Sequence, residues 1–192
     1  LDRDAAETLS RKPIPGPGQG RRDGNVNTNL MSVGGTLCAC VEAGSIPVEL
    51  DYELQSVRRT DFHGTLEAGF TGHPKFDPIT HEQHALAYEP FQPIRYISVD
   101  RDGCAKTKAR IDLPHIPLIH DMAFTQSFII VPDFPVTFQP ELSHTDFPWL
   151  WDERRDCRIG LLPRNGDVSR IQWFEAPRCF AFHFANAYDD GD

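Results

Sequence analysis

The most constraining feature of this sequence is a series of short β-like runs separated by turn residues. Runs at 28–33, 36–41 and 46–50 are divided by Gly34-Gly35 and by Ala43-Gly44-Ser45. Such spacing predicts strands joined by tight turns. Further runs of the same kind occur at 85–88, 94–99, 105–111, 121–131, 157–163, 169–174 and 179–188. No stretch of about 12 residues carries an apolar stripe at helical spacing, so the sequence predicts an all-β fold.

The runs gather into groups of about four, and the groups recur roughly every 40 to 60 residues. This recurrence favours a β-propeller, in which four-stranded sheets surround a central channel. A β-sandwich is the main alternative, because the groups share their spacing but little of their sequence.

Two regions are distinguished by composition. Residues 11–25 contain three prolines and the run Pro15-Gly16-Pro17-Gly18, without apolar periodicity, so residues 1–25 are predicted to form a Pro/Gly-rich connector. Residues 26–192 are predicted to form the β domain. The chain begins without Met and without the apolar core of a secretory signal, and we expect it to be part of a longer protein.

Charge and hydropathy exclude some classes of partner. The 28 acidic residues outnumber the 19 basic ones and give a net charge of −9, which disfavours binding to a nucleic-acid backbone. No uninterrupted apolar run, including Phe128 to Val131, comes near the roughly 20 residues of a membrane-spanning helix. The five cysteines are an odd and scattered set, which indicates a reduced, cytoplasmic setting. Cys38 and Cys40 share one face of a predicted strand and are expected to pack in the core.

Three histidines lie in polar and aromatic settings that suit metal ligands: His73, His120 and His183. Their separations of 47 and 63 residues suit one ligand from each of three successive sheets facing a common axis. Imidazole binds iron, zinc, copper or nickel, so the ligand type does not name the metal. Taken singly, a histidine in a β protein is more often a packed or surface residue than a metal ligand. Glu42, between apolar neighbours, is a candidate acceptor for the outer nitrogen of a metal-bound histidine.

The remaining histidines lack this context and are expected in solvated loops. His81 and His84 are spaced three residues apart and follow a Pro-containing turn, which departs from the four-residue spacing of a helical zinc motif. His63, His115 and His144 lie beside turn residues or prolines.

Several local motifs resemble the carotenoid cleavage oxygenases, the family that includes apocarotenoid oxygenases, lignostilbene dioxygenases and the retinal pigment epithelial membrane protein. They are Asn27-Thr28-Asn29, Val41-Glu42-Ala43-Gly44, Gly72-His73-Pro74-Lys75, His120-Asp121 with Ala123 and Thr125, and Phe182-His183 with Asn186-Ala187-Tyr188. The resemblance runs from about Pro15 to Asp192, with the motifs in the family's order.

The resemblance implies a seven-bladed propeller, of which this chain would hold about three blades, with Fe(II) on four axial histidines. His73, His120 and His183 match the first three ligands, and the fourth would lie beyond Asp192. Glu42 matches a glutamate that accepts a hydrogen bond from an iron-bound histidine, expected to be the third, His183. The segment by itself is expected to be inactive, because a partial propeller lacks ligands and leaves strand edges unpaired.

The activity implied is cleavage of a conjugated carbon–carbon double bond by O2, giving two carbonyl products. Val41 stands where stilbene-cleaving relatives carry a lysine, which favours a carotenoid or apocarotenoid as substrate. Alternatives are a stilbenoid substrate, isomerohydrolase chemistry on a retinoid ester, and a metal-free propeller that serves as a binding scaffold. Val41, Phe147 and Trp149 are candidate tunnel residues, although core packing is also expected for the aromatic group that includes Trp151. Such a hydrophobic substrate implies peripheral contact with a membrane.

Overall fold

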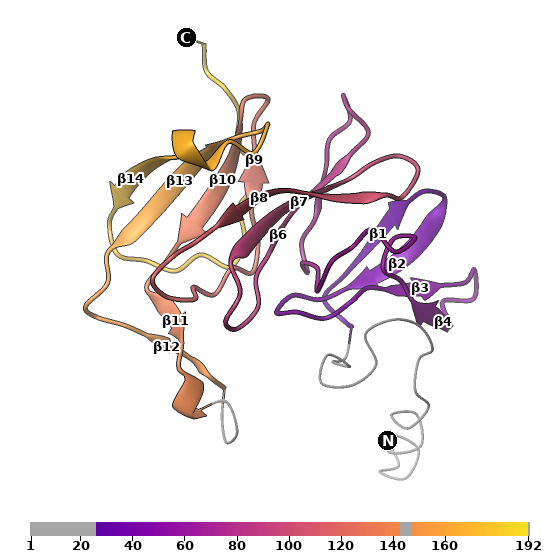
Figure 1. Ribbon diagram of the computed structural model, residues 1–192, viewed down its shortest axis with the longest axis horizontal. Helices are drawn as coiled ribbons and strands as arrows, with labels where there is room; N and C mark the ends of the chain where they lie inside the picture. The colour runs from indigo at the N-terminus through magenta and orange to yellow at the C-terminus, as the bar shows by residue number, and fades with distance from the viewer. Residues whose placement is uncertain (1–25, 143–146, 192) are drawn as a thin grey trace.

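Within residues 26–142 and 147–191, which the computed structural model describes, the strands form three four-stranded antiparallel sheets and one two-stranded ribbon. Figure 1 shows the three larger sheets side by side along the long axis of the molecule. The first contains β1 (Asn29–Val33), β2 (Thr36–Cys40), β3 (Val48–Leu50) and β4 (Ser56–Arg59). The second contains β5 (Lys75–Phe76), β6 (Gln83–Ala87), β7 (Ile94–Val99) and β8 (Ala105–Ile111). The third contains β9 (Ala123–Phe124), β10 (Phe128–Asp133), β13 (Cys157–Pro163) and β14 (Gln172–Ala176).

Each large sheet is a meander in which every strand pairs with the next one of that sheet along the chain. In the third sheet the chain leaves after β10 to form the ribbon of β11 (Val136–Phe138) and β12 (Trp149–Trp151), and then returns as β13. The ribbon projects from the lower edge of the molecule in Figure 1. Two short 3-10 turns, Pro140–Leu142 and Val168–Arg170, complete the regular structure of the described residues. The predicted all-β class is therefore confirmed, whereas the connector predicted at 1–25 lies outside the described residues.

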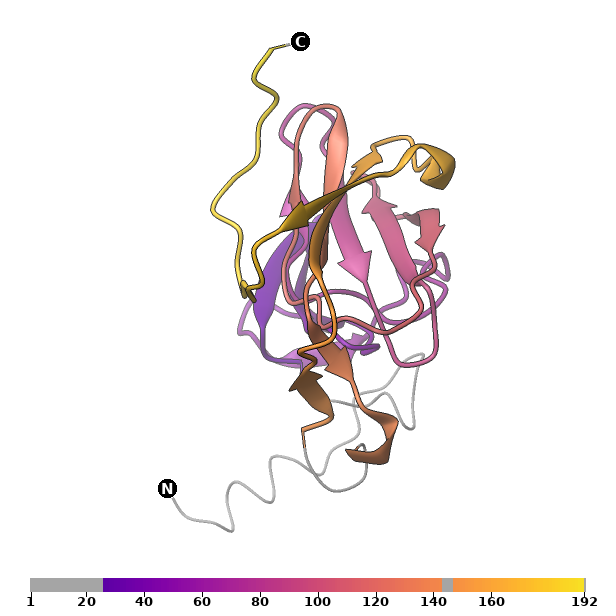
Figure 2. The same ribbon diagram turned by 90° about the vertical axis from the view of Figure 1, so that its left-hand side faces the viewer.

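Several of the predicted runs differ from the structure, and the run at 121–131 contains two strands, β9 and the start of β10, separated by a turn. The expected strand at 179–188 is not one, because this segment pairs with no neighbouring strand among the described residues. Figures 1 and 2 show it leaving β14 as an extended, unpaired stretch of chain. The run at 169–174 begins in a 3-10 turn, and its strand starts only at Gln172. Apolar alternation describes one face of a segment, but a strand also needs a partner for its backbone.

The core lies between the sheets, and the second sheet is apolar on both faces. Ile94 and Tyr96 of β7 pack toward the third sheet, whereas Ile97 and Val99 of the same strand pack toward the first. Alternate residues of a strand point to opposite faces, so all six residues of β7 are buried. Cys38 and Cys40 are buried in the cluster between the first and second sheets, and burial raises the pKa of Cys38 to about 12. The expected packing role of this pair is confirmed.

His84 is not the loop residue that its sequence context predicts. It lies in the middle of β6 and is 0% exposed. The guanidinium of Arg164 donates to its Nε2 at 2.7 Å, and its Nδ1 lies 3.0 Å from the hydroxyl of Tyr96. Arg164 also pairs with Asp77 at 2.5 Å. Since Arg164 follows β13 while His84 belongs to β6, this polar cluster joins the third sheet to the second.

The other four histidines with loop predictions have mixed outcomes. His63 and His81 are exposed as expected. His115 is half-buried instead, with its Nε2 2.7 Å from Asp133 and its Nδ1 accepting from Arg155 at 2.9 Å. His144 lies outside the described residues. A loop position in the sequence therefore does not exclude buried hydrogen bonds with distant partners.

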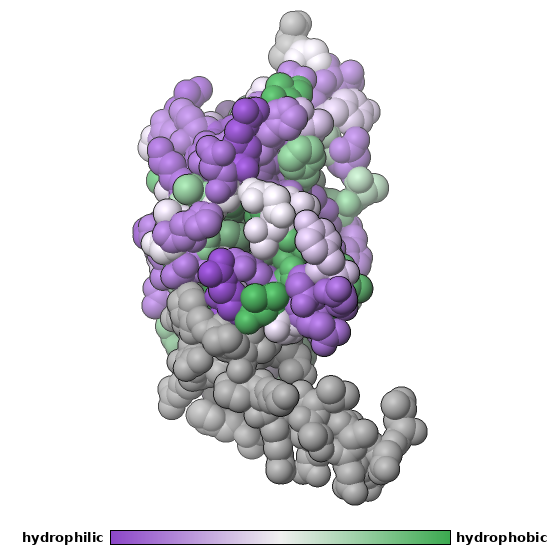
Figure 3. Space-filling model, turned by 90° about the vertical axis from the view of Figure 1, so that its right-hand side faces the viewer, coloured by the Kyte–Doolittle hydropathy of each residue, from purple (hydrophilic) through white to green (hydrophobic). Residues whose placement is uncertain are grey.

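No helix in the part of the chain that the structure describes is long and apolar enough to span a membrane. On the face drawn in Figure 3, hydrophobic residues are interspersed among hydrophilic ones. The exposed apolar side chains of the described residues include Leu30 and Val57 of the first sheet. Scattered single apolar residues are ordinary on protein surfaces.

Candidate metal centre

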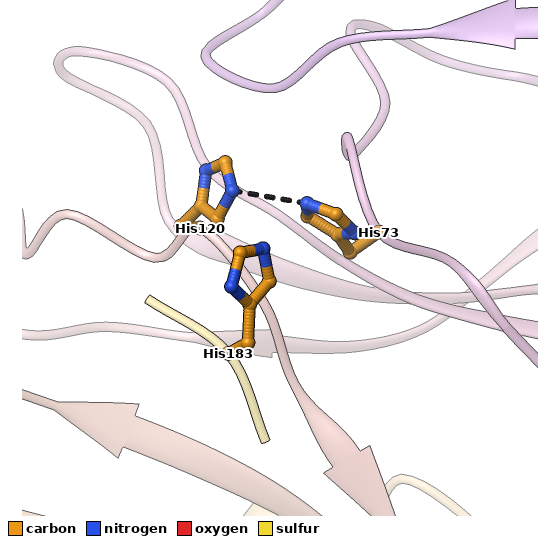
Figure 4. Close-up of side chains that lie close together, drawn as sticks. All are labelled: His73, His120 and His183. Atoms are coloured by element: carbon orange, nitrogen blue, oxygen red, sulfur yellow. Dashed lines mark hydrogen bonds between the residues drawn. The ribbon is translucent and has the colours of Figure 1, made fainter. Parts of the chain in front are cut away.

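The three histidines singled out by the sequence converge on one point. Figure 4 shows His73, His120 and His183 with their rings facing a common centre. The Nε2 atoms of His73 and His120 are 2.9 Å apart, and the ring of His183 lies 4.9 Å and 5.0 Å from the other two rings, centroid to centroid. One nitrogen of each ring lies within 4.8 Å of the corresponding nitrogens of the other two.

The repeating sheets explain why two of these histidines meet. β5 and β9 each form the edge strand of their sheet, and His73 and His120 come two and three residues before them. Neighbouring sheets therefore present a histidine from the same position in the meander. His183 reaches the centre from the unpaired segment that follows β14, and it is the most exposed of the three.

Glu42 fixes one of the rings, although not the one expected. Its Oε1 accepts a hydrogen bond from the Nδ1 of His120 at 2.8 Å. The expectation that Glu42 serves His183 is therefore wrong in this structure, because the outer nitrogen within reach of the carboxylate belongs to His120. A carboxylate can only accept, so Nδ1 carries the proton and the neutral ring turns the lone pair of Nε2 toward the centre.

A glycine makes room for this carboxylate. A Cβ at Gly72, the residue before His73, would lie 2.5 Å from the Oε2 of Glu42. Thr28 also donates its hydroxyl to that oxygen, at 3.4 Å. Any larger side chain at position 72 would displace Glu42 from its place behind His120, so the Gly72-His73 pair contributes to two parts of the centre at once.

The electrostatics favour a neutral ring at His73. The pKa of His73 lies below its usual value, first because the ring is partly buried and second because the neighbouring His120 disfavours a second positive charge. Only an unprotonated nitrogen can bind a metal. The surroundings of His73 therefore favour the form in which imidazole is a ligand.

Asp121 joins all three histidine segments and was not singled out as a site residue from the sequence. Its side chain is nearly inaccessible, with 3% of the residue exposed. The carboxylate lies 2.7 Å from the Nζ of Lys75 and accepts the backbone N–H of Phe184 at 3.0 Å. Lys75 follows His73 by two residues, Asp121 follows His120, and Phe184 follows His183. The one signal available in the sequence was an acidic residue directly after a candidate ligand, within an otherwise apolar stretch.

The geometry fits a transition-metal ion. A metal bound by imidazole at about 2.1 Å holds adjacent ligand nitrogens about 3.0 Å apart and opposite ones about 4.2 Å apart. The 2.9 Å between the Nε2 atoms of His73 and His120 matches the first value. All three ligand nitrogens lie within 4.8 Å of one another, a limit that is little more than half an ångström above the second value. Three imidazoles with one carboxylate behind them are typical of first-row metals that prefer nitrogen ligands.

A cavity of about 550 Å³ is lined mainly by residues that follow the three histidines in the sequence, and also by Arg164, but not by the histidines themselves. Its wall includes Lys75, Phe76, Phe124, Phe184 and Tyr188. None of the three candidate tunnel residues belongs to this wall. Among those candidates, Val41 is half-buried beside Glu42, and Phe147 is 67% exposed. Trp149 is buried against Tyr88 and Phe138. For Trp149 the structure therefore shows core packing, which was expected from the sequence as the alternative to a tunnel role.

Comparison with known proteins identifies the family. The family described as "Retinal pigment epithelial membrane protein" matches residues 5–192. The chain belongs to this family. A "Carotenoid cleavage oxygenase" of Mycobacterium tuberculosis is 29% identical over 226 residues, covering 96% of this chain and 45% of that protein. A "Carotenoid 9,10(9',10')-cleavage dioxygenase" of Crocus sativus is 36% identical over 176 residues, covering 88% of this chain and 32% of that protein. The chain therefore spans less than half the length of these relatives.

Solved structures of the family share the fold. The crystal structure of the Pseudomonas brassicacearum lignostilbene dioxygenase matches 83% of this chain with a TM-score of 0.75 and 26% identity, and this chain covers 34% of that structure. A cobalt-substituted Synechocystis ACO matches 86% of the chain with a TM-score of 0.74 at 24% identity. The three four-stranded sheets are thus blades of the seven-bladed propeller of carotenoid oxygenases, present here in part and not closed into a ring. The predicted partial propeller is confirmed.

Proposed function

We propose that the protein to which this chain belongs is an Fe(II)-dependent dioxygenase that cleaves a conjugated double bond of a carotenoid or apocarotenoid. The observation that carries the proposal is the convergence of His73, His120 and His183, with Glu42 behind one of them, in a chain of this family. The relatives from Mycobacterium and Crocus are named for carotenoid cleavage, which supports this class of substrate.

In this proposal the three histidines hold the metal through their inner nitrogens. Bound Fe(II) would supply open positions where dioxygen is activated beside an alkene. The net reaction adds both oxygen atoms of O2 to the two alkene carbons and requires no net proton transfer. The side chains described here therefore serve to hold ligands and place the substrate, and none of them needs to act as an acid or a base.

Glu42 and Asp121, the two carboxylates that contact the histidine segments, act in different ways. Glu42 keeps the proton of His120 on Nδ1 and so keeps Nε2 free. Asp121 keeps the segments of the three ligands together through Lys75 and the backbone of Phe184. Partners of this kind typically account for 10- to 100-fold in metal affinity. Both carboxylates act through other residues, so they are positioning groups.

Placement of a long apolar substrate would depend on the walls around the centre. Phe76, Phe124 and Phe184 line the cavity of about 550 Å³, and aromatic walls favour a rigid polyene over a polar ligand. Such substrates partition into membranes, so the proposal includes peripheral contact of the whole protein with a bilayer surface.

A stilbenoid substrate is the second candidate. The likeness to a lignostilbene dioxygenase structure at 26% identity favours it. Val41 disfavours it, because stilbene-cleaving members resemble one another in carrying lysine at this position, and valine offers no donor for a phenol. A metal-free scaffold is disfavoured by the shared orientation of the three rings, which a scaffold does not require.

The test uses the protein expressed at its natural full length and loaded with Fe(II). Iron content is measured together with O2-dependent bleaching of an apocarotenal, and His120→Ala is compared with the surface variant His81→Ala. We expect about one iron per chain, with bleaching lost only in His120→Ala. Bound iron with cleavage of a stilbenoid and no bleaching would move the substrate to the second candidate. Absence of iron from the full-length protein would refute the dioxygenase.

A further inference from the structure

Two cysteines lie close together near the start of the segment that carries His183. The Sγ atoms of Cys157 and Cys179 are 3.8 Å apart. Cys157 is the first residue of β13 and is buried, whereas Cys179 is exposed and both are free thiols. Cys179 comes three residues after Ala176, which pairs directly with Cys157 in the β13–β14 hairpin. The chain therefore turns back over the start of β13 as it leaves the sheet.

We propose that Cys157 and Cys179 form a reversible disulfide that fastens the His183 segment to the third sheet. A disulfide needs its sulfur atoms about 2.05 Å apart, so the observed pair closes through side-chain rotation and a small movement of residue 179. No strand pairing among the described residues fixes the backbone of residue 179. The other described cysteines lack such an arrangement: Cys38 and Cys40 are buried in the core between the first and second sheets.

The chemistry is exchange with a small-molecule disulfide such as oxidised glutathione. The exposed thiolate of Cys179 attacks one glutathione sulfur, the glutathione S–S bond breaks, and one reduced glutathione leaves. The thiolate of Cys157 then attacks the sulfur of Cys179 and releases the second glutathione. The two cysteines lose two electrons and two protons, and these appear in two reduced glutathione molecules. Exposure of one partner and burial of the other give this order of attack.

The segment that would be fastened has no strand pairing among the described residues, so separate hydrogen bonds and ring contacts hold it. Its backbone at Phe184 donates to Asp121, and Asp189 accepts from the backbone of Ser127 at 3.1 Å. Phe180 packs edge-on against Phe134, with ring centroids 5.8 Å apart. A bond at position 179 would restrain the chain four residues before His183, within roughly 14 Å of extended backbone. Fastening therefore limits the positions that the His183 ring can reach.

The experiment needs neither iron nor substrate, so its failure is separate from failure of the proposed function. The full-length protein is equilibrated with reduced or oxidised glutathione, its free thiols are blocked, and it is digested with trypsin. Cleavage after Arg155, Arg158 and Arg178 isolates Asp156-Cys157-Arg158 and a peptide that begins at Cys179. We expect these two peptides to be joined after oxidation and separate after reduction. Cys179→Ser should abolish the joined species, whereas Cys104→Ser should leave it unchanged.

Hydrogen exchange provides the second measurement. Amides at 180–184 should exchange at least about threefold more slowly in the oxidised protein than in the reduced one, and this difference should vanish in Cys179→Ser. A persistent mixed disulfide between Cys179 and glutathione, or unmodified thiols at both positions after oxidation, would overturn the proposal. A joined peptide without any change in exchange would overturn the fastening role.

Discussion

Protonation of His84 should make the protein sensitive to mild acid. The guanidinium of Arg164 has no acceptor atom, so the 2.7 Å contact requires a bare Nε2 on His84. A proton added at Nε2 would break that hydrogen bond and place two positive charges together. Burial, followed by the charge of Arg164, lowers the pKa of His84 from 6.5 to about 4. The nearby carboxylates Glu82 and Asp77 oppose this shift without reversing it.

The size of the effect follows from linkage between protonation and folding. In the unfolded chain the histidine would titrate at 6.5, and in the folded protein at about 4. The unfolded state therefore binds more protons between these values, and the free energy of unfolding falls as the pH falls through this window. Relative to pH 7.5, the loss is about 2 kcal/mol at pH 5 and approaches about 3 kcal/mol below pH 4, because each pKa unit corresponds to about 1.4 kcal/mol.

Urea unfolding of the full-length protein at pH 7.5 and pH 5 tests this reasoning. His84→Gln keeps an oxygen that can accept from Arg164 but removes the titration, so its loss between the two pH values should be about 2 kcal/mol smaller than that of the wild type. His81→Gln, an exposed neighbour, should behave as the wild type does. Protonation of the metal-centre histidines affects all three proteins alike and cancels in the comparison. Equal losses in wild type and His84→Gln would refute the assignment of the acid sensitivity to His84.

Three further predictions follow from single contacts. Asp121→Asn keeps the shape of the side chain but removes its charge from Lys75, so Fe(II) affinity should fall about tenfold in a metal titration; unchanged affinity would contradict the positioning role. Gly69→Ala would place a Cβ 2.2 Å from the backbone of Gly44, and urea unfolding should show a destabilisation of at least about 2 kcal/mol. Trp149→Ala should cost about 3–5 kcal/mol, whereas Phe147→Ala should change stability by less than about 0.5 kcal/mol; similar costs would contradict the difference in burial.

The sequence predicts the longer strands of this fold well. The runs at 94–99, 105–111 and 157–163 coincide with β7, β8 and β13 to the residue, because each lies between strong turn residues. The two-residue strands β5 and β9 are too short to produce a periodic pattern. The run at 179–188 shows the opposite error, in which a strand-like pattern does not form a strand. Its apolar residues alternate, but no adjacent strand in the described chain completes the backbone hydrogen bonds.

Some features of the candidate site can likewise be predicted from the sequence, and others cannot. The spacing of His73, His120 and His183 is a property of the sequence, and it predicts that they come from successive repeats. The partner of Glu42 could not be assigned in this way, because it depends on which ring nitrogen faces away from the centre. The burial of His84 could not be predicted either, since its partner Arg164 lies 80 residues further along the chain. Contacts between sheets decide both cases, and no local pattern encodes them.

The three proposed ligands differ in how firmly the fold holds them. His73 and His120 directly precede strands whose sheets share a buried core, and Glu42 braces the second ring. His183 lies on a segment that has no strand pairing among the described residues, and contacts with Asp121, His120 and Phe134 hold this segment to the rest of the fold. Substitutions that shift His183 should therefore change metal affinity more than substitutions near His73 or His120. Asp121 and the Cys157–Cys179 pair both restrain the position of the His183 ring, from opposite ends of the segment 179–184. Their effects on this segment should therefore not be additive.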